Sequence, residues 1–331
     1  MMTLHPARVL FMSTLLLGAF IAVSSSSWFT GWLGLELNLL SFIPLISSKS
    51  NIYSSEAALK YFLIQALGSS IILASAPGLI SFKSALLMIL CALLLKMGAA
   101  PVHFWFPSVM QGIGWLQCVM LMTIQKIAPM LMLSYLVSSD TMIVPISSML
   151  SSLVGSLGGL NQTLMRKIMS YSSINHMGWM LAAMYISTPM WTNYFMIYMI
   201  VTSTVVSIMH SQQIFHFSQT SSTSHRSTLT KIMMFFSMLS LGGLPPFLGF
   251  LPKMMVIKSL VSSNALMWLA ILLFSALITL FYYLRIIMTS LTLTSPKMKT
   301  SPTLPMNSIS MSMSFINLIP LICPLMALLP F

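Results

Sequence analysis

Residues 95–105 read Leu95-Lys96-Met97-Gly98-Ala99-Ala100-Pro101-Val102-His103-Phe104-Trp105, in the middle of an apolar segment over 83–112. A helix of about 20 apolar residues already spans a bilayer, and this segment is longer. Pro101 lacks a backbone donor and its ring clashes with the preceding turn, so we expect the helix to break there. Backbone groups freed inside a membrane need a protein partner or a polar cavity. The run therefore predicts an interrupted membrane helix with a lysine beside the interruption.

A second interruption is predicted in the segment 229–258, whose centre reads Leu241-Gly242-Gly243-Leu244-Pro245-Pro246-Phe247-Leu248-Gly249-Phe250. Counting apolar segments places each interruption in the fourth helix of a five-helix block. Because five is odd, the second block would be inverted relative to the first. Matched interrupted helices are typical of inverted repeats with a transport site between them. The alternative is a pair of ordinary proline kinks, which membrane helices tolerate.

The composition indicates an integral membrane protein. Of 331 residues, 57% are hydrophobic and 5% are charged, with 15 Lys and Arg against 3 Asp and Glu. A soluble domain carries about 25% charged residues, because a water-exposed surface needs them. This composition excludes a soluble enzyme, a nucleic-acid-binding protein and a disordered chain. The net charge of +12 reflects a shortage of acidic residues.

The apolar segments define the predicted fold. There are about eleven of spanning length, at residues 6–24, 27–46, 54–77, 83–112, 114–137, 142–162, 167–187, 192–216, 229–258, 264–290 and 313–330. We predict an all-α, polytopic membrane protein with two inverted five-helix repeats, each with a broken helix, followed by a C-terminal helix. The corresponding domains are residues 1–138, 139–290 and 291–331.

Basic loop residues predict the orientation of these segments. If the N-terminus lies on one side, that side receives Arg8, Lys49, Arg166, Lys167, Arg226, Lys231, Lys297 and Lys299, whereas the opposite side receives Lys83 and Lys258. We therefore expect the N-terminus on the cytoplasm-like side. Residues 1–9 carry one Arg and no cleavage-site pattern, so we expect neither a signal peptide nor a transit peptide.

Six ionisable residues are predicted within the spans, namely Glu36, Lys60, Lys96, Lys126, His176 and Lys253. An acid or a lysine at the helix centre costs about 2.5–3.5 kcal/mol on insertion scales, so such groups are expected to face one another or internal water. A lysine that is removed from water releases its proton more readily, a nearby carboxylate opposes that release, and histidine titrates near neutrality. The chemistry that this set predicts is proton transfer.

A structural role is the alternative for each of these residues. A structural ion pair would account for Lys96, Lys126 and Glu36. A histidine with hydrogen-bonded ring nitrogens is common inside helix bundles, which would account for His176. Lys253 and Lys60 lie nearer the ends of their segments, where a lysine can extend to the interface. Glu56 stands one turn before Lys60 as an ordinary i,i+4 partner. His103 follows the first interruption and is a candidate for lining a cavity there.

Patterns for redox or hydrolytic chemistry are missing from the sequence. Gly155, Gly158 and Gly159 lie inside a span without a strand–helix unit, so we interpret them as packing glycines rather than a nucleotide loop. Histidines do not pair at matched depth on two helices as a haem would require. Asp140 is the only aspartate, which disfavours a Ser-His-Asp set. We therefore expect no cofactor and no metal in this chain.

Six motifs carry a resemblance to a known family. They are Gly34-Leu35-Glu36-Leu37-Asn38, Glu56-Ala57-Ala58-Leu59-Lys60-Tyr61-Phe62-Leu63, Lys96-Met97-Gly98-Ala99-Ala100-Pro101-Val102-His103-Phe104-Trp105-Phe106-Pro107, Gln125-Lys126-Ile127-Ala128-Pro129, Ser173-Ile174-Asn175-His176-Met177-Gly178-Trp179, and the second interruption with Lys253. Over nearly its whole length the chain resembles the antiporter-like membrane subunits of respiratory complex I. The run Ser108-Val109-Met110-Gln111-Gly112 departs from some members, in which an acidic residue and further prolines follow. The 33 methionines are typical of an animal mitochondrial gene.

The resemblance implies a core membrane-arm subunit of NADH:ubiquinone oxidoreductase that translocates protons across the mitochondrial inner membrane, with its N-terminus on the matrix side. It implies that Glu36 and Lys96 form the carboxylate–lysine pair of a first half-channel. Lys126 would be the central connecting lysine, and His176 would lead to the second half. Lys253 would end that half, toward the intermembrane space. Lys60 is a further candidate for proton transfer.

Partners also follow from the resemblance. They are a neighbouring antiporter-like subunit, small membrane subunits, accessory subunits and lipids such as cardiolipin, without nucleic acid. NADH, FMN, iron–sulfur clusters and ubiquinone would belong to partner subunits. Two other functions stay open: a subunit of a multi-subunit cation/proton antiporter, and a structural scaffold that has lost pumping.

Overall fold

The computed structural model describes residues 6–47, 51–79, 82–137, 142–220, 228–292 and 317. Within these ranges the regular structure is helical, apart from one isolated antiparallel bridge between Leu164 and His216. The predicted all-α fold is therefore confirmed. The eleventh predicted span, 313–330, lies outside the described residues except for Asn317. The chain divides into two compact units, Met1–Ser147 and Ser148–Phe331.

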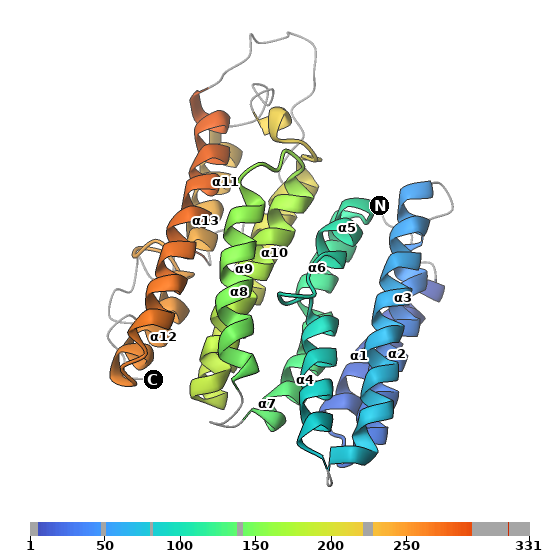
Figure 1. Ribbon diagram of the computed structural model, residues 1–331. Coiled ribbons are helices and arrows are strands. Elements are labelled where there is room, and N and C mark those ends of the chain that lie inside the picture. Colours follow the sequence, from blue (N-terminus) through green and yellow to red (C-terminus); the bar gives the residue numbers. More distant parts are fainter. Residues whose placement is uncertain are drawn as a thin grey trace. The chain divides into compact units, whose positions relative to one another are not determined.

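The first unit is a bundle of helices (Figure 1). Its helices are α1 (Pro6–Val23), α2 (Trp28–Ile46), α3 (Ile52–Ser75), η1 (Ala76–Leu79), α4 (Lys83–Met97), α5 (Trp105–Gly112), α6 (Trp115–Met122) and α7 (Ile124–Leu136), and α8 (Ile143–Gly159) begins in it. Helix α3 packs against α2, α4 and α5, and α4 packs against α7. Helices α1 and α2 meet closely because Gly34 has no side chain; a Cβ there would stand 2.5 Å from the Ala22 nitrogen.

The second unit is built around α9. It contains α9 (Met165–Ile186), α10 (Thr188–Ser211), η2 (Phe217–Thr220), α11 (Thr228–Gly242), α12 (Phe250–Ser262) and α13 (Leu266–Thr292). Helix α9 packs against α10, α12 and α13, and almost all of its residues between Ile168 and Met184 are buried. A Cβ on Gly155 of α8 would stand 2.5 Å from the Asn175 nitrogen, so the predicted packing role of this glycine is confirmed.

In the part of the chain that the structure describes, six helical segments are long and apolar enough to cross a membrane. They are Pro6–Val23, Trp28–Ile46, Ile52–Leu79, Trp115–Leu136, Thr188–Ser211 and Leu266–Ser290, with shorter apolar helices at Ser84–Met97, Ile143–Gly159 and Lys231–Gly242. Helix α9 is more polar than these, but the other helices of its unit cover it, so its polar groups face protein. The count of eleven spans stays a prediction.

Both predicted interruptions are confirmed. Helix α4 ends at Met97 and α5 begins at Trp105, whereas α11 ends at Gly242 and α12 begins at Phe250. A third interruption, which we did not predict, separates α6 from α7 at Thr123. The Thr123 hydroxyl donates to the Val119 carbonyl at 2.6 Å, a local bond that competes with the helical ladder.

Candidate functional site

Lys96 lies one residue before the last residue of α4, directly before the first interruption. Its side chain is 5% exposed, and its stem packs against Gly68 of α3, where a Cβ would stand 3.0 Å from the lysine Cγ. The carbonyls freed at the end of α4 find partners in the same unit. Gln65 Nε2 donates to the Lys96 carbonyl at 3.1 Å, and Trp105 Nε1 donates to the Leu95 carbonyl at 3.0 Å. Side chains of α3 and α5 therefore hydrogen-bond to two of the carbonyls at the end of α4.

Glu36 on α2 acts on Lys96 from a distance. Its carboxylate is half-buried and exerts a Coulombic effect on the Lys96 ammonium. The two side chains do not form a direct ion pair, since among the described residues the one such pair is Lys60–Glu56. The structure thus brings the predicted carboxylate and lysine into electrostatic reach of each other.

Lys126 lies in the first turn of α7, three residues after the unexpected interruption at Thr123. Its side chain is 2% exposed, and its Nζ lies 5.1 Å from the ring centroid of Phe106, which is a cation–π distance. The neighbouring Gln125 accepts a hydrogen bond from the Tyr61 hydroxyl at 3.2 Å. This lysine is therefore placed at a helix interruption, like Lys96, although the sequence showed only Pro129 nearby.

Lys60 lies apart from these buried lysines. Its side chain is 46% exposed and its Nζ bonds the Glu56 carboxylate at 2.6 Å, one turn away on α3. His103, in contrast, is 6% exposed, and its Nδ1 lies 3.2 Å from the Pro101 carbonyl within the first interruption. The structure thus places His103 inside the interrupted segment and Lys60 on the outer face of its helix.

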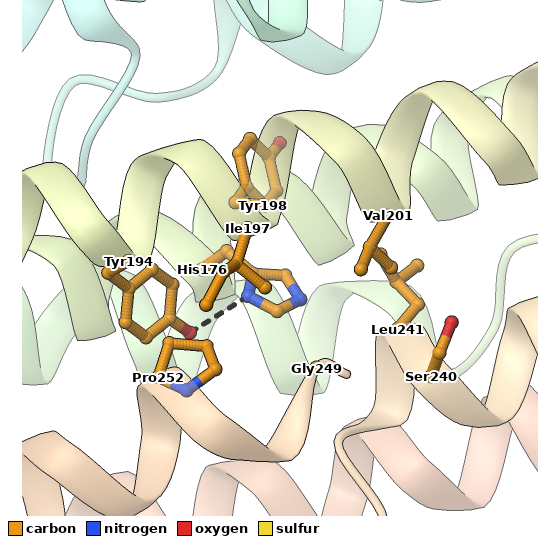
Figure 2. Close-up of a pocket in the computed structure, with 9 residues that line it drawn as sticks. All are labelled: His176, Tyr194, Ile197, Tyr198, Val201, Ser240, Leu241, Gly249 and Pro252. Carbon is orange, nitrogen blue, oxygen red and sulfur yellow. Dashed lines mark hydrogen bonds between the residues drawn. The ribbon is translucent and has the colours of Figure 1, made fainter. Parts of the chain in front are cut away.

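His176 of α9 is the buried titratable group at the centre of the second unit. Its Nδ1 lies 3.0 Å from the Tyr194 hydroxyl, and its ring centroid lies 5.1 Å from that of Tyr198. A small pocket adjoins the ring and is lined by both tyrosines, by Ser240 of α11 and by Gly249 at the second interruption (Figure 2). One ring nitrogen is thus held by Tyr194, and the other faces the pocket.

Lys253 of α12 reaches back to the second interruption. Its Nζ donates to the Gly242 carbonyl, the last of α11, at 2.8 Å, and lies 5.7 Å from the Trp179 ring centroid. The side chain is 4% exposed. Gly243 has φ +77°, and a Cβ there would stand 2.9 Å from the lysine Nζ. The lysine therefore caps the end of α11, and only a glycine leaves room for it.

Four polar residues of the site were not singled out from the sequence, namely Gln65, Trp105, Tyr194 and Tyr198. Each contacts His176 or a carbonyl at the end of α4 from another helix, so the contact depends on how the helices pack. Among the described residues, no group of three or more His, Cys, Asp or Glu side chains could hold a metal ion.

These features define a class: α-helical membrane proteins with buried ionisable side chains beside interrupted helices. The chain belongs to the NADH:quinone oxidoreductase/Mrp antiporter transmembrane family, which matches residues 25–86 and 77–279. A relative is NADH-ubiquinone oxidoreductase chain 2 of Anopheles gambiae, which is 44% identical over 325 residues, or 93% of this chain and 94% of the relative.

Two solved structures have the same fold. The first is respiratory complex I from Thermus thermophilus with bound aureothin, at TM-score 0.85 and 24% identity over 98% of this chain and 80% of that one. The second is the Mrp complex from a Dietzia species, at TM-score 0.78 and 20% identity over 89% of this chain and 62% of that one. At these identities the likeness establishes the fold alone.

Proposed function

We propose that this chain is a core membrane-arm subunit of NADH:ubiquinone oxidoreductase in the mitochondrial inner membrane and that it translocates protons. Support comes from relatives such as the mosquito chain 2 protein, which match it over nearly their full length. The proton-carrying residues are Glu36, Lys96, Lys126, His176 and Lys253. Electron transfer from NADH to ubiquinone, with its flavin and iron–sulfur groups, takes place in partner subunits.

The observation that carries the proposal is the burial of three lysines beside three helix interruptions. Lys96, Lys126 and Lys253 are each at most 5% exposed. Placing a lysine at the centre of a membrane helix costs about 2.5–3.5 kcal/mol. Three buried lysines therefore indicate a function such as an ion path, because each of them destabilises the inserted helix. Interrupted helices supply free backbone groups and polar space, which a moving proton needs.

The chemistry is proton transfer between nitrogens through water. In the first unit, Glu36 favours the charged form of Lys96, so a change in their separation alters how tightly Lys96 holds its proton. Lys126 receives the proton on its Nζ. In the second unit, His176 keeps one ring nitrogen bonded to Tyr194 and exchanges a proton at the other. Lys253 releases the proton beyond the second interruption.

We also propose the two inverted five-helix repeats, residues 1–138 and 139–290, with residues 291–331 as linker and C-terminal helix. Two features support them. Both interruptions contain seven residues, 98–104 and 243–249, and both begin with a left-handed glycine, Gly98 at φ +73° and Gly243 at φ +77°. The excess of basic loop residues on one side supports an N-terminus in the matrix.

A subunit of a multi-subunit cation/proton antiporter is the second candidate. The family includes Mrp antiporters, and the fold of a solved Mrp complex matches this chain. A native gel of solubilised membranes separates the two functions. Comigration of this chain with in-gel NADH dehydrogenase activity at very high mass supports the first, and migration at lower mass without that activity contradicts it.

Proton translocation is tested with Lys96→Met, which keeps the stem and removes the charge. Coupled NADH oxidation and proton uptake in membrane vesicles should be lost, because the first unit then lacks the proposed proton carrier at its first interruption. The control is Lys258→Met, which removes an exposed lysine of α12. Normal pumping with full NADH turnover in the Lys96 variant would refute the proposed path.

A further inference from the structure

Helix α3 has two faces of opposite character. Leu59, Leu63 and Leu67 are exposed, whereas the polar Tyr61 and Gln65 are 2% and 6% exposed. Hydrocarbon offers no hydrogen bonds, so the apolar face of a membrane helix meets lipid and its polar face meets protein. The polar groups of α3 are therefore directed at the interior of the first unit, where the proposed proton carriers lie.

Gln65 fixes the end of α4 at Lys96. Its Nε2 donates to the Lys96 carbonyl at 3.1 Å. Gly68 follows three residues later on the same face, and a Cβ there would stand 3.0 Å from the Cγ and 3.4 Å from the Cε of the lysine. Helix α3 thus holds Lys96 by its backbone and also packs along its side chain.

Tyr61 lies one turn before Gln65 on the same face and fixes the start of α7. Its hydroxyl donates to the Oε1 of Gln125, the residue before Lys126, at 3.2 Å. The Nε2 of Gln125 is buried and has no hydrogen-bond partner among the described residues. An amide that is buried and half unpaired is destabilising. The bond to Tyr61 is therefore the interaction that accounts for a glutamine beside the lysine.

The Tyr61 ring is itself held in place. It meets the Phe42 ring of α2 edge to face at 5.2 Å between centroids, and its centroid lies 6.0 Å from that of Trp105. Trp105 in turn donates to the Leu95 carbonyl, next to Lys96. Tyr61 thus contacts groups that belong to both the interruption at Thr123 and the first interruption.

Phe106 joins these two interruptions a second time. A Cβ on Gly98 would stand 3.1 Å from the Phe106 Cβ, and the Lys126 Nζ lies 5.1 Å from the Phe106 ring centroid. One side chain therefore packs between the first interruption and Lys126. Because protein interiors are close-packed, a shift of one is transmitted to the other.

We propose that Tyr61 and Gln65 are positioning residues, which use one face of α3 to hold Lys126 and Lys96 in register with each other. Reacting groups must be held in a narrow range of geometries, and a misplacement of about 1 Å slows a reaction roughly 10²-fold. Neither Tyr61 nor Gln65 carries the proton. Each holds the backbone or the neighbour of a lysine that does. The inference rests on the proposed function.

The test compares Tyr61→Phe with Gln125→Leu in the assembled complex. The two variants remove opposite partners of one hydrogen bond and largely keep the side-chain volume. Coupled NADH oxidation per assembled complex should fall about fivefold in each, which is the factor that one neutral hydrogen bond contributes to an equilibrium. In the double variant the rate should fall no further than in Gln125→Leu, because the two residues share that bond. Gln65→Leu, which removes the second anchor, should also lower the rate about fivefold.

The matched control is Ser69→Ala. This buried serine lies on α3 one turn after Gln65, and its hydroxyl donates to the Ala66 carbonyl of its own helix. The rate per assembled complex should stay the same in this variant. A merely structural role of Tyr61 or Gln65 would lower the amount of assembled complex on a native gel and leave the rate per assembled complex unchanged.

Normal rates per assembled complex in Tyr61→Phe and Gln65→Leu would overturn the positioning role, as would independent losses that multiply in the Tyr61/Gln125 double variant. If Lys126→Met still abolished pumping in that case, the proposed function would stand and only the positioning role would fall. If Lys126→Met also left pumping intact, the proposed function itself would fail.

Should the variants not assemble, structures of the unaltered complex at rest and during turnover decide the matter. The separation of the Lys96 and Lys126 Cα atoms should agree between the two states within about 0.5 Å, the tolerance of a preorganised site. A larger change in that separation overturns the proposal.

Discussion

Two interruptions can be compared, one between α4 and α5 and one between α11 and α12. Both begin with the same backbone turn. In each, the residue after a left-handed glycine donates its N–H to a carbonyl five positions back: Ala99 to Leu94, and Leu244 to Leu239. Glycine takes this conformation without steric cost, and the resulting turn ends a helix abruptly. The same local device thus stops α4 and α11.

The two interruptions differ in the side chains that donate hydrogen bonds to the last carbonyls of the helix. At the first interruption the donors are the amide of Gln65 and the indole of Trp105, which do not titrate. At the second the donor is the Lys253 ammonium. A cation at a helix C-terminus also interacts favourably with the helix dipole. The comparison teaches that the side-chain donors at the first interruption do not titrate, whereas the donor at the second is itself a titratable group.

The largest effect is expected from Lys253→Met. The variant removes a proposed proton carrier and the cap of α11 together, and a hydrogen bond from a charged donor contributes about 1.5–3 kcal/mol. Coupled proton pumping should be lost, and the temperature at which the chain dissociates from its complex should fall. Lys258→Met on the same helix is the matched control. If Lys253→Met and Lys258→Met lowered pumping and thermal stability equally, Lys253 would have no special role at the second interruption.

A smaller effect separates Gly243→Ala from Gly98→Ala. A side chain in the left-handed region costs about 1–2 kcal/mol in both variants, so both should lose thermal stability. At Gly243 the new Cβ also displaces the lysine amine from the Gly242 carbonyl, whereas at Gly98 it meets only the Phe106 side chain, 3.1 Å away. Pumping per NADH oxidised should therefore fall more in Gly243→Ala. The opposite order would show that the first interruption is the more sensitive one.

The smallest effect is expected from Trp105→Phe. The variant keeps an aromatic ring and removes one neutral hydrogen bond to the Leu95 carbonyl, at a cost of about 1 kcal/mol. Thermal stability should decrease slightly and the pH profile of NADH oxidation should stay the same, because no titrating group is lost. A shifted pH profile would mean that the first interruption also responds to protonation.

Local sequence sufficed for both proline-containing interruptions, because glycine and proline act on the backbone at their own positions. Composition and segment length likewise predicted an all-α membrane protein. The interruption at Thr123 was not predicted, because threonine is common inside membrane helices. The nearest proline, Pro129, lies within α7 and does not end it. Lys60 and Lys96 are alike in sequence terms, as lysines in apolar segments, yet one is 46% and the other 5% exposed.

The sequence by itself predicted the helical class of the fold and two of the interruptions, and it suggested which residues carry a proton. Only the tertiary structure decided which of those residues are buried and what they touch. Gln65 meets the Lys96 carbonyl, and Tyr194 meets His176, through packing of separate helices. Helix formation and interruption follow from short-range backbone physics, whereas burial and capping depend on which helix faces come together, and that is settled by packing across the whole unit.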